Sequence, residues 1–245
     1  MKRFYREASA APAEGGFAIL LDGRPVKTPA RNPLLVPAET LGMAIATEWN
    51  EQGEEIDPRA MPLTGLANAA IDRVAPDPAV FAGTLAAYGE SDLLCYRAEG
   101  PPPLVRRQEE SWDWLLAWAR QRYDVDFETA CGVIHRAQPA ETVDRLARAV
   151  AARDPFRLAA LSPLVTISGS LVIALALAEG AIGPDSAWAA ATLDEAWQAE
   201  QWGADSLAFQ ALEARRRDFG AACLFLTLLQ APPRSARPSP HGRAA

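Results

Sequence analysis

The sequence has few of the residues on which most catalytic and metal sites depend. Its 245 residues include two histidines and three cysteines. The cysteines, Cys95, Cys131 and Cys223, are far apart and form no CxxC pair, so neither a disulfide framework nor a zinc site is predicted. His241 lies in a proline-rich stretch at the end of the sequence, and His135 stands alone between an isoleucine and an arginine. The sequence therefore predicts no metal centre and no cofactor.

The commonest signatures of nucleotide-binding, hydrolytic and zinc-dependent enzymes are also missing. No GxxxxGK[ST], GxGxxG, GxSxG or HExxH pattern occurs. Adjacent acids do occur, for example at residues 54–55 and 109–110. Neighbours on a helix point about 100° apart, so such pairs do not bring two carboxylates together. A small-molecule enzyme is the least favoured class of function.

Positive charge is in short supply. There are 24 lysines and arginines against 31 acids, which gives a net charge of −7, and no basic stripe is present. Neither nucleic acid nor an anionic membrane is therefore expected as the main partner. The uncharged run at residues 164–178 is about five residues too short to span a membrane, so it predicts a helix buried in protein without membrane insertion. No secretory signal is recognisable, and the expected location is the cytoplasm.

Short extended segments come first in the chain. Residues 17–28 predict a β-hairpin with Asp22 and Gly23 at its turn, because this pair accepts the positive φ of a tight primed turn. Residues 3–5 and 34–36 are further short strand candidates. A small antiparallel sheet is the simplest arrangement of these segments.

Helical patterns fill the rest of the chain. Apolar spacing changes to a helical period after residue 37, and Asp77 with Pro78 is typical of a helix start. Further helices are predicted at about 140–152, 162–180, 185–203 and 205–230, with the last two possible as one continuous helix. Strands followed by helices predict an α+β fold. The expected organisation is a β-rich N-terminal domain at 1–62, a mainly α-helical domain at 63–231 and a disordered tail at 232–245.

One face of the helix predicted at 185–203 combines aromatic and polar side chains. Glu195, Gln198, Trp202 and Asp205 follow the spacing i, i+3, i+7 and i+10, and Trp197 lies on the neighbouring stripe. Aromatic residues mixed with fixed polar groups are typical of a protein contact surface. An ordinary amphipathic helix, with the tryptophans in the core and the acids in solvent, is the alternative. The predicted contact residues are Asp194, Glu195, Trp197, Gln198, Trp202, Gly203 and Asp205.

Five stretches, in register from residue 21 to 203, resemble a known family. They are LDGRPVKTP at 21–29, ATEWNEQ at 46–52, MPLT with LAN and DR within 61–73, Tyr88 with SDLLCYR at 91–97, and Gln198 with Trp202 and Gly203. With these residues the chain resembles the ATP synthase assembly chaperones that handle the alpha subunit of the enzyme's catalytic head.

The resemblance implies a binding protein that is not an enzyme. Members bind the newly made alpha subunit and prevent its aggregation until it joins the beta subunit. The resemblance also implies a β-rich domain followed by a helical one, and the chain is most similar to the bacterial, cytoplasmic form, expected as a monomer. Glu195 and Trp202 would be central contacts. An acidic adaptor for another partner is the alternative, ahead of a small-molecule enzyme.

Overall fold

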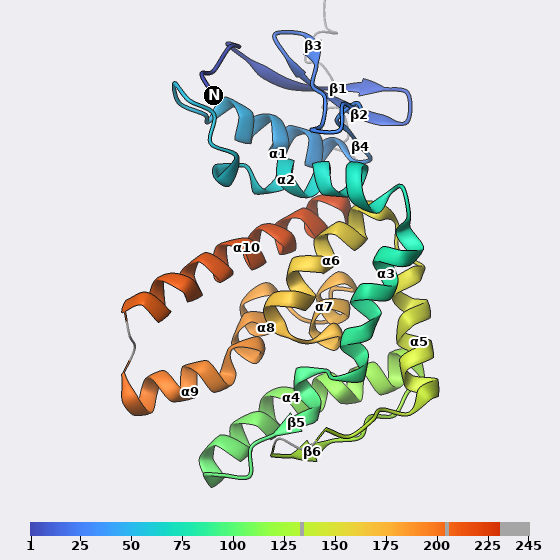
Figure 1. The fold of residues 1–245 in the computed structure, drawn as a ribbon, viewed down its shortest axis with the longest axis vertical. Coiled ribbons are helices and arrows are strands. Elements are labelled where there is room, and N and C mark those ends of the chain that lie inside the picture. The colour runs from blue at the N-terminus through green and yellow to red at the C-terminus, as the bar shows by residue number, and fades with distance from the viewer. Residues whose placement is uncertain (133–134, 204–205, 231–245) are drawn as a thin grey trace, which may run out of the picture.

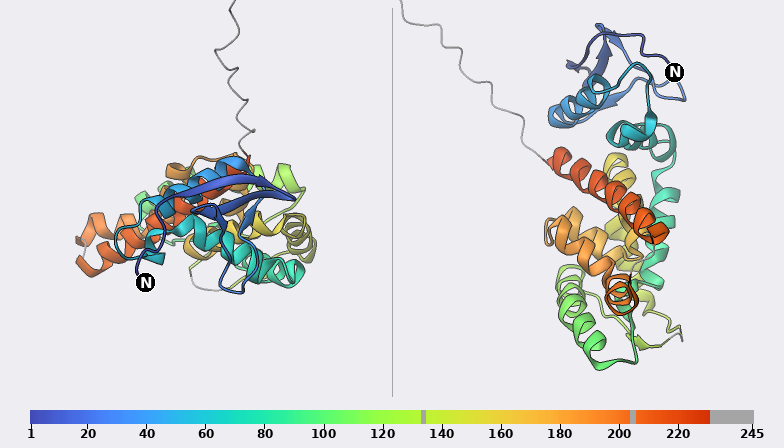
Figure 2. Two further views of the ribbon diagram at one scale, coloured as in Figure 1. Left: turned by 90° about the horizontal axis from the view of Figure 1, so that it is seen from above. Right: turned by 90° about the vertical axis from the view of Figure 1, so that its left-hand side faces the viewer.

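The computed structural model describes residues 1–132, 135–203 and 206–230. Short strands occupy the first part of the chain and helices dominate the rest, which confirms the predicted α+β class. Figure 1 shows the sheet at one end of an elongated molecule, and the right-hand view of Figure 2 shows α4 (Pro102–Tyr123) at the other end. Between these ends, α6 (Pro155–Ser168) and α7 (Leu171–Ala178) pack against each other and against several of the other helices.

The sheet at the top of Figure 1 has β2 as its central strand. Its strands are β1 (Ala8–Ala13), β2 (Gly16–Leu21), β3 (Arg24–Pro25) and β4 (Leu35–Val36). β2 pairs antiparallel with each of the other three. Asp22 and Gly23 turn the chain from β2 into β3 with φ values of 48° and 76°. The predicted hairpin and the short strand near residues 34–36 are therefore confirmed.

The N-terminal edge of the sheet differs from the prediction. The sequence does not indicate β1, because its alanines, serine and proline favour strands only weakly. β1 nevertheless pairs with β2 along its whole length, from Ala8 opposite Leu21 to Ala13 opposite Gly16. Residues 3–5, predicted as a strand, lie in an irregular segment. That prediction was wrong because this segment is held by contacts with the loop after α1 (Glu39–Asn50) rather than by the sheet.

The helix α1 packs on the sheet, and its last turn holds the start of α2 (Pro62–Ala69). The buried carboxylate of Glu48 accepts the backbone N–H groups of Leu63 and Thr64 at 2.7 and 2.8 Å, and the Thr64 hydroxyl at 2.7 Å. Burial raises the pKa of Glu48, and these hydrogen bonds oppose the rise. Glu48 thus satisfies N–H groups in the first turn of α2 that have no partner within the helix.

The apolar run at residues 164–178 is buried, as predicted, but it is not one helix. Gly169 ends α6 in the left-handed region, with φ of 66°, and the hydroxyl of Ser170 accepts the N–H of Ile173 to cap α7. The single helix predicted at 162–180 is therefore wrong, because a glycine and a capping serine stand side by side within it. All eight residues of α7 are buried. Within the part of the chain that the structure describes, no helix combines the length and apolar character needed to cross a membrane.

A buried aspartate joins this α6–α7 junction to the segment before α4. The Asp92 carboxylate accepts the N–H groups of Leu94 and Val172 at 3.0 and 2.9 Å, and its residue is fully buried. Burial raises the pKa of Asp92 to about 6, against the effect of these hydrogen bonds. A strongly raised carboxyl pKa is a common property of catalytic acids. Here both oxygens are occupied by backbone amides, so the carboxylate caps two segments instead.

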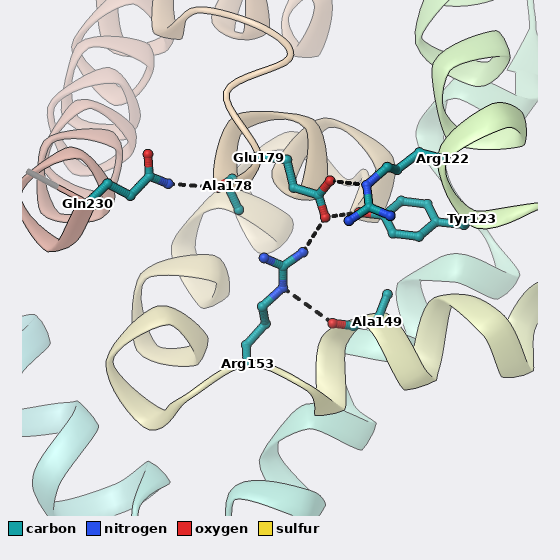
Figure 3. Close-up of polar contacts among 7 residues, drawn as sticks. All are labelled: Arg122, Tyr123, Ala149, Arg153, Ala178, Glu179 and Gln230. Atoms are coloured by element: carbon teal, nitrogen blue, oxygen red, sulfur yellow. Dashed lines mark hydrogen bonds and ion pairs between the residues drawn. The ribbon is translucent and has the colours of Figure 1, made fainter.

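A second polar cluster lies where α7 ends (Figure 3). The half-buried Glu179 accepts the Tyr123 hydroxyl at 2.9 Å and the Arg153 guanidinium at 2.5 Å, and it pairs with Arg122 as well. Burial would raise the pKa of Glu179, but these three hydrogen bonds lower it below its usual value. The Gln230 amide, at the end of the last helix, donates to the carbonyl of the residue before Glu179 at 2.8 Å. The cluster fastens three distant parts of the chain to the end of α7.

The remaining predictions before residue 180 are mostly confirmed. Asp77 caps α3 (Pro78–Ala86) by accepting the N–H of Val80 at 3.1 Å, and α5 (Ala140–Ala151) matches the helix predicted at 140–152. A parallel pair of two-residue strands, β5 (Tyr96–Arg97) and β6 (Ala130–Cys131), lies beside α4. The domain boundary at residue 62 stays a prediction, and the tail at 232–245 lies outside the described residues.

Candidate partner-binding surface

The helix predicted at 185–203 is divided in two. Its first part is α8 (Pro184–Ala191), and its second part is α9 (Leu193–Trp202), with Thr192 between them in a non-helical conformation. Gly203, with φ of 82°, ends α9, and α10 begins at Ser206 and continues to Gln230. The single helix at 185–203 was therefore wrong, and so was its possible continuation into 205–230.

We call α9 together with residues 206–218 of α10 the arm. Figure 1 shows the arm projecting from the left side of the helical bundle. Leu193 is the one buried residue of α9, and none of residues 206–218 is buried. The second half of α10, by contrast, packs on α6 and α2 and buries Phe219 and Phe225. The arm is therefore held at its base and open to solvent along most of its length.

Large apolar side chains are exposed around the turn of the arm. Trp202 at the end of α9 is 79% exposed, and Phe209 in the first turns of α10 is 56% exposed. Leu207 between them is also exposed. Single exposed apolar residues are common, but three at the end of α9 and the start of α10 are typical of a surface that another protein covers. The alternative that Trp202 is a core residue is wrong.

Glu195 pairs with a residue of the arm itself. Its carboxylate accepts the Arg215 guanidinium of α10 at 2.7 Å, and Arg215 also donates to the carbonyl of Ile167 in α6 at 3.1 Å. Both charged side chains of the pair are more than a third exposed. The interaction therefore ties α9 to α10 and α6, yet it remains accessible from solvent, where such pairs contribute little to stability.

Two other predicted residues face α4 instead of solvent. The Trp197 ring lies 4.9 Å from the Arg107 guanidinium of α4, which also holds the Glu200 carboxylate through two contacts of 2.8 Å. That pairing lowers the pKa of Glu200. Asp194 accepts the Gln108 amide of α4 at 2.8 Å. Trp197 and Asp194 are therefore partly buried and help to hold α9 on α4.

Comparison with known proteins decides the family. Residues 2–120 match the sequence model of the ATP12 chaperone protein family. Atp12 from Paracoccus denitrificans is 42% identical in sequence to this chain. Its crystal structure matches with a TM-score of 0.89, over 94% of this chain and 98% of that chain. The chain belongs to the ATP12 chaperone family. An aspartate-to-lysine variant of the Paracoccus protein matches with the same figures, and the mitochondrial atp12 protein of Schizosaccharomyces pombe is 25% identical over 82% of this chain and 74% of its own length.

Members of the ATP12 family are ATP synthase assembly chaperones, so the recognition made from the five sequence stretches is confirmed. Most of these stretches have structural roles in this chain. Glu48, in the ATEWNEQ stretch, caps α2, and Asp92, in SDLLCYR, caps α7. Asp72 accepts the Thr28 hydroxyl at 2.7 Å and the Asn32 amide at 2.9 Å, which fastens the sheet to the helices. Family resemblance on its own therefore does not mark a binding residue here.

The predicted contact residues of this ATP12 chain are only partly brought together. Glu195, Gln198, Trp202 and Gly203 are exposed on α9 or at its end, as a contact surface requires. Asp205 lies outside the described residues. The role of these residues in binding stays a prediction.

Sequence reasoning missed the half of the arm that belongs to α10. Phe209 is exposed there, while Arg215 pairs with Glu195, and Arg107 of α4 pairs with Glu200 in the last turn of α9. A signal was available, because apolar residues 207, 209 and 212 precede three consecutive arginines at 215–217. Residues 209 and 212 share one helix face at helical spacing, but residue 207 lies on the opposite side, so this signal was weak and could equally have come from a buried face.

No group of side chains suited to a metal ion occurs in the described part of the chain. Within residues 1–132, 135–203 and 206–230, no three His, Cys, Asp or Glu side chains are grouped so that they could hold a metal ion. His135 contacts the Tyr96 hydroxyl through its Nδ1 atom at 2.8 Å, on the exposed side of β5. The arm is therefore the candidate that best fits the chaperone family.

Proposed function

We propose that this protein captures the unassembled alpha subunit of the F-type ATP synthase, prevents its aggregation and releases it for assembly with the beta subunit. The arm is the surface that binds the alpha subunit. The protein acts in the cytoplasm. The observation that carries this proposal is the exposure of Trp202 and Phe209 at the turn of the arm. Membership of a family of assembly chaperones supports an ATP synthase subunit as the client.

The exposed Trp202 and Phe209 side chains suit a client subunit that has not yet assembled with the other subunits of its ring. A subunit made for a ring exposes interface surface, including apolar area, until it assembles, and that surface drives aggregation. Aromatic side chains such as those of Trp202 and Phe209 can cover such area at low cost in side-chain entropy. Because both lie on helices fixed at their bases, they are presented before the client arrives.

The Glu195–Arg215 pair gives the arm a way to exchange partners. An arginine of the client can replace Arg215 on the Glu195 carboxylate, since either guanidinium forms a charge-assisted hydrogen bond with it. The internal pair is exposed, so its loss costs no more than about 1 kcal/mol. Exchange of one guanidinium for another keeps the interaction reversible, as release to the beta subunit requires.

The test follows aggregation of the cognate alpha subunit by light scattering as it refolds from denaturant. The parent protein should suppress scattering and elute with the alpha subunit in gel filtration. A Trp202→Ser, Phe209→Ser double variant should weaken the complex about 10- to 100-fold, because both aromatic contacts are lost. Glu195→Lys should weaken it as well, since it places a cation where the client presents an arginine.

The matched control is Val80→Ser, which also removes an exposed apolar side chain. Val80 is in α3, which lies on the side of the molecule opposite the arm in Figure 1. It should suppress scattering as well as the parent does. If the arm variants captured the alpha subunit as tightly as the parent, the arm would not be the binding surface. If the parent itself neither suppressed scattering nor formed a complex, an adaptor for another partner would be the better explanation.

A further inference from the structure

A groove of about 800 Å³ lies in the sheet region, far from the base of the arm. It is bounded by the N-terminal segment, the turn between β2 and β3, and the loop after α1. Its lining includes the apolar side chains of Tyr5, Leu21, Val26, Trp49 and Ile56. The volume and the apolar lining are typical of a binding site. The LDGRPVKTP stretch, which the arm does not use, forms one wall.

The walls of this groove are fixed by hydrogen bonds. The Arg3 guanidinium donates to the carbonyl oxygens of Gln52 and Arg6 at 2.6 and 2.8 Å, which pins the N-terminal segment to the loop after α1. On the other side, the Asp22 carboxylate accepts the backbone N–H groups of Arg6 and Glu7, each at 3.0 Å. The groove is therefore formed before any ligand binds, which reduces the entropic cost of binding.

Two groups at the groove lack a use within the fold. Phe4 lies at the mouth, 68% exposed, with its ring edge against Tyr5. The indole N–H of Trp49 is shielded from water and has no acceptor among the described residues. A buried donor without an acceptor is unfavourable.

The groove lining carries more basic than acidic side chains, whereas the protein as a whole is acidic. Arg24 and Lys27 both line it, with Asp22 as the acid of the lining, and the Asp22 oxygens are already engaged by backbone N–H groups. The protein as a whole carries a net charge of −7. An occupant with a carboxylate beside apolar groups would therefore complement the charge and the apolar lining of this groove.

We propose that this groove is a second docking site for the client, and that it takes an extended segment in which apolar side chains stand next to an acidic residue. A polypeptide is favoured over a small molecule because the groove opens beside the exposed Phe4 ring, which a small ligand would leave uncovered. In Figure 1 the N-terminal segment and the arm lie on the same side of the molecule, and Figure 2 agrees. One client can contact both, and two linked sites bind more tightly than either alone. The identity of the client rests on the proposed function.

The direct test is calorimetric titration with blocked octapeptides. The first alternates leucine and glutamate, the second leucine and glutamine, and the third serine and glutamate. The leucine–glutamate peptide should bind the parent protein most tightly. Phe4→Ser and Lys27→Glu should each weaken that binding about tenfold, because they remove an apolar contact and reverse a charge at the groove. Trp202→Ser, on the arm, should leave it unchanged, and circular dichroism should show that all three variants fold.

Two results would overturn the proposal. One is equal affinity of the leucine–glutamate peptide for the parent and for both Phe4→Ser and Lys27→Glu. The other is binding of sodium decanoate, but not of any peptide, which would make the groove a site for a small apolar carboxylate.

Capture of the alpha subunit separates this proposal from the proposed function. Phe4→Ser should weaken capture about tenfold, as loss of one of two linked sites predicts. If arm variants abolish capture while Phe4→Ser has no effect, the groove proposal fails and the proposed function stands. If the parent does not capture the alpha subunit at all, the proposed function fails, and the peptide titration still decides whether the groove binds polypeptide.

Discussion

The two halves of α10 carry similar apolar side chains and use them differently. Phe219, Phe225 and Leu226 in the second half are buried against α6 and α2, whereas Leu207 and Phe209 in the first half are exposed. Both halves belong to one helix, so helix propensity does not separate them. What differs is the neighbour that each half meets. The exposed apolar side chains are therefore the part of this helix that a partner protein could contact.

The largest effect on stability is expected in the buried half. Phe225→Ala should lower the free energy of unfolding by about 3–5 kcal/mol, because the fully buried ring also stacks on Phe156 and its removal leaves a cavity. Urea denaturation followed by far-UV circular dichroism measures the loss. A loss below about 1 kcal/mol would mean that the core collapses around the smaller side chain, and the contrast between the halves would then be weaker than the structure implies.

The next largest effect on stability is expected at the α6–α7 junction, which the buried Asp92 caps. Asp92→Asn should lower the free energy of unfolding by about 2–3 kcal/mol, since the new amide N–H₂ must face a backbone N–H in place of an oxygen. Denaturation of parent and variant at neutral pH gives this difference.

The same pair of proteins should show a defined pH dependence. The pKa of Asp92 is raised to about 6 in the folded protein, above its ordinary value, so the folded state binds this proton more tightly than the unfolded state does. The stabilisation from protonation is present at low pH and is lost as pH rises through 6. The advantage of the parent over Asp92→Asn should therefore grow by about 2 kcal/mol between pH 7 and pH 4. A difference that stays constant over this range would contradict the assignment of the shift to Asp92.

A smaller effect on stability is expected at the ion pair between Glu195 of α9 and Arg215 of α10. A double-mutant cycle with Glu195→Gln and Arg215→Gln should give a coupling energy of no more than about 1 kcal/mol, because the pair is exposed. High salt should reduce it further. A coupling of several kcal/mol would mean that the pair locks the arm, and the proposed exchange with a client arginine would then be too costly.

The smallest effect on stability is expected at the exposed phenylalanine. Phe209→Ala should change the free energy of unfolding by less than about 0.5 kcal/mol, although it removes the same side chain from the same helix as Phe225→Ala. Capture of the alpha subunit should nevertheless weaken. A marked loss of stability would place Phe209 in the fold and remove it from the proposed binding surface.

Local patterns predicted the elements whose signal lies within a few residues. The Asp22–Gly23 turn and the Asp77 cap of α3 formed as expected, because a turn or a cap is decided by the residues that compose it. β1 was missed because its stability comes from pairing with β2 and from packing on α1 rather than from its own sequence. The breaks at Gly169 and Thr192 were missed because apolar periodicity alone gave longer helices.

The candidate surface was predicted less well than the fold. The face of Glu195, Gln198 and Trp202 was placed on a helix correctly, and their exposure agrees with a contact role. Trp197 and Asp194, from the same helix, are engaged with α4. Helical spacing gives the angle between side chains on one helix, but it does not say which neighbouring helix covers which face. Phe209 and Arg215 were missed for that reason.

The sequence by itself determined the class of fold, the ATP12 family and the absence of the common enzyme motifs, because each depends on composition or on residues close together in the chain. Only the tertiary structure decided that Glu48 and Asp92 act as buried caps, that Glu195 meets Arg215, and that the groove beside Trp49 exists. These contacts join residues up to 80 positions apart. They form when distant segments pack together, so no local pattern of residues encodes them.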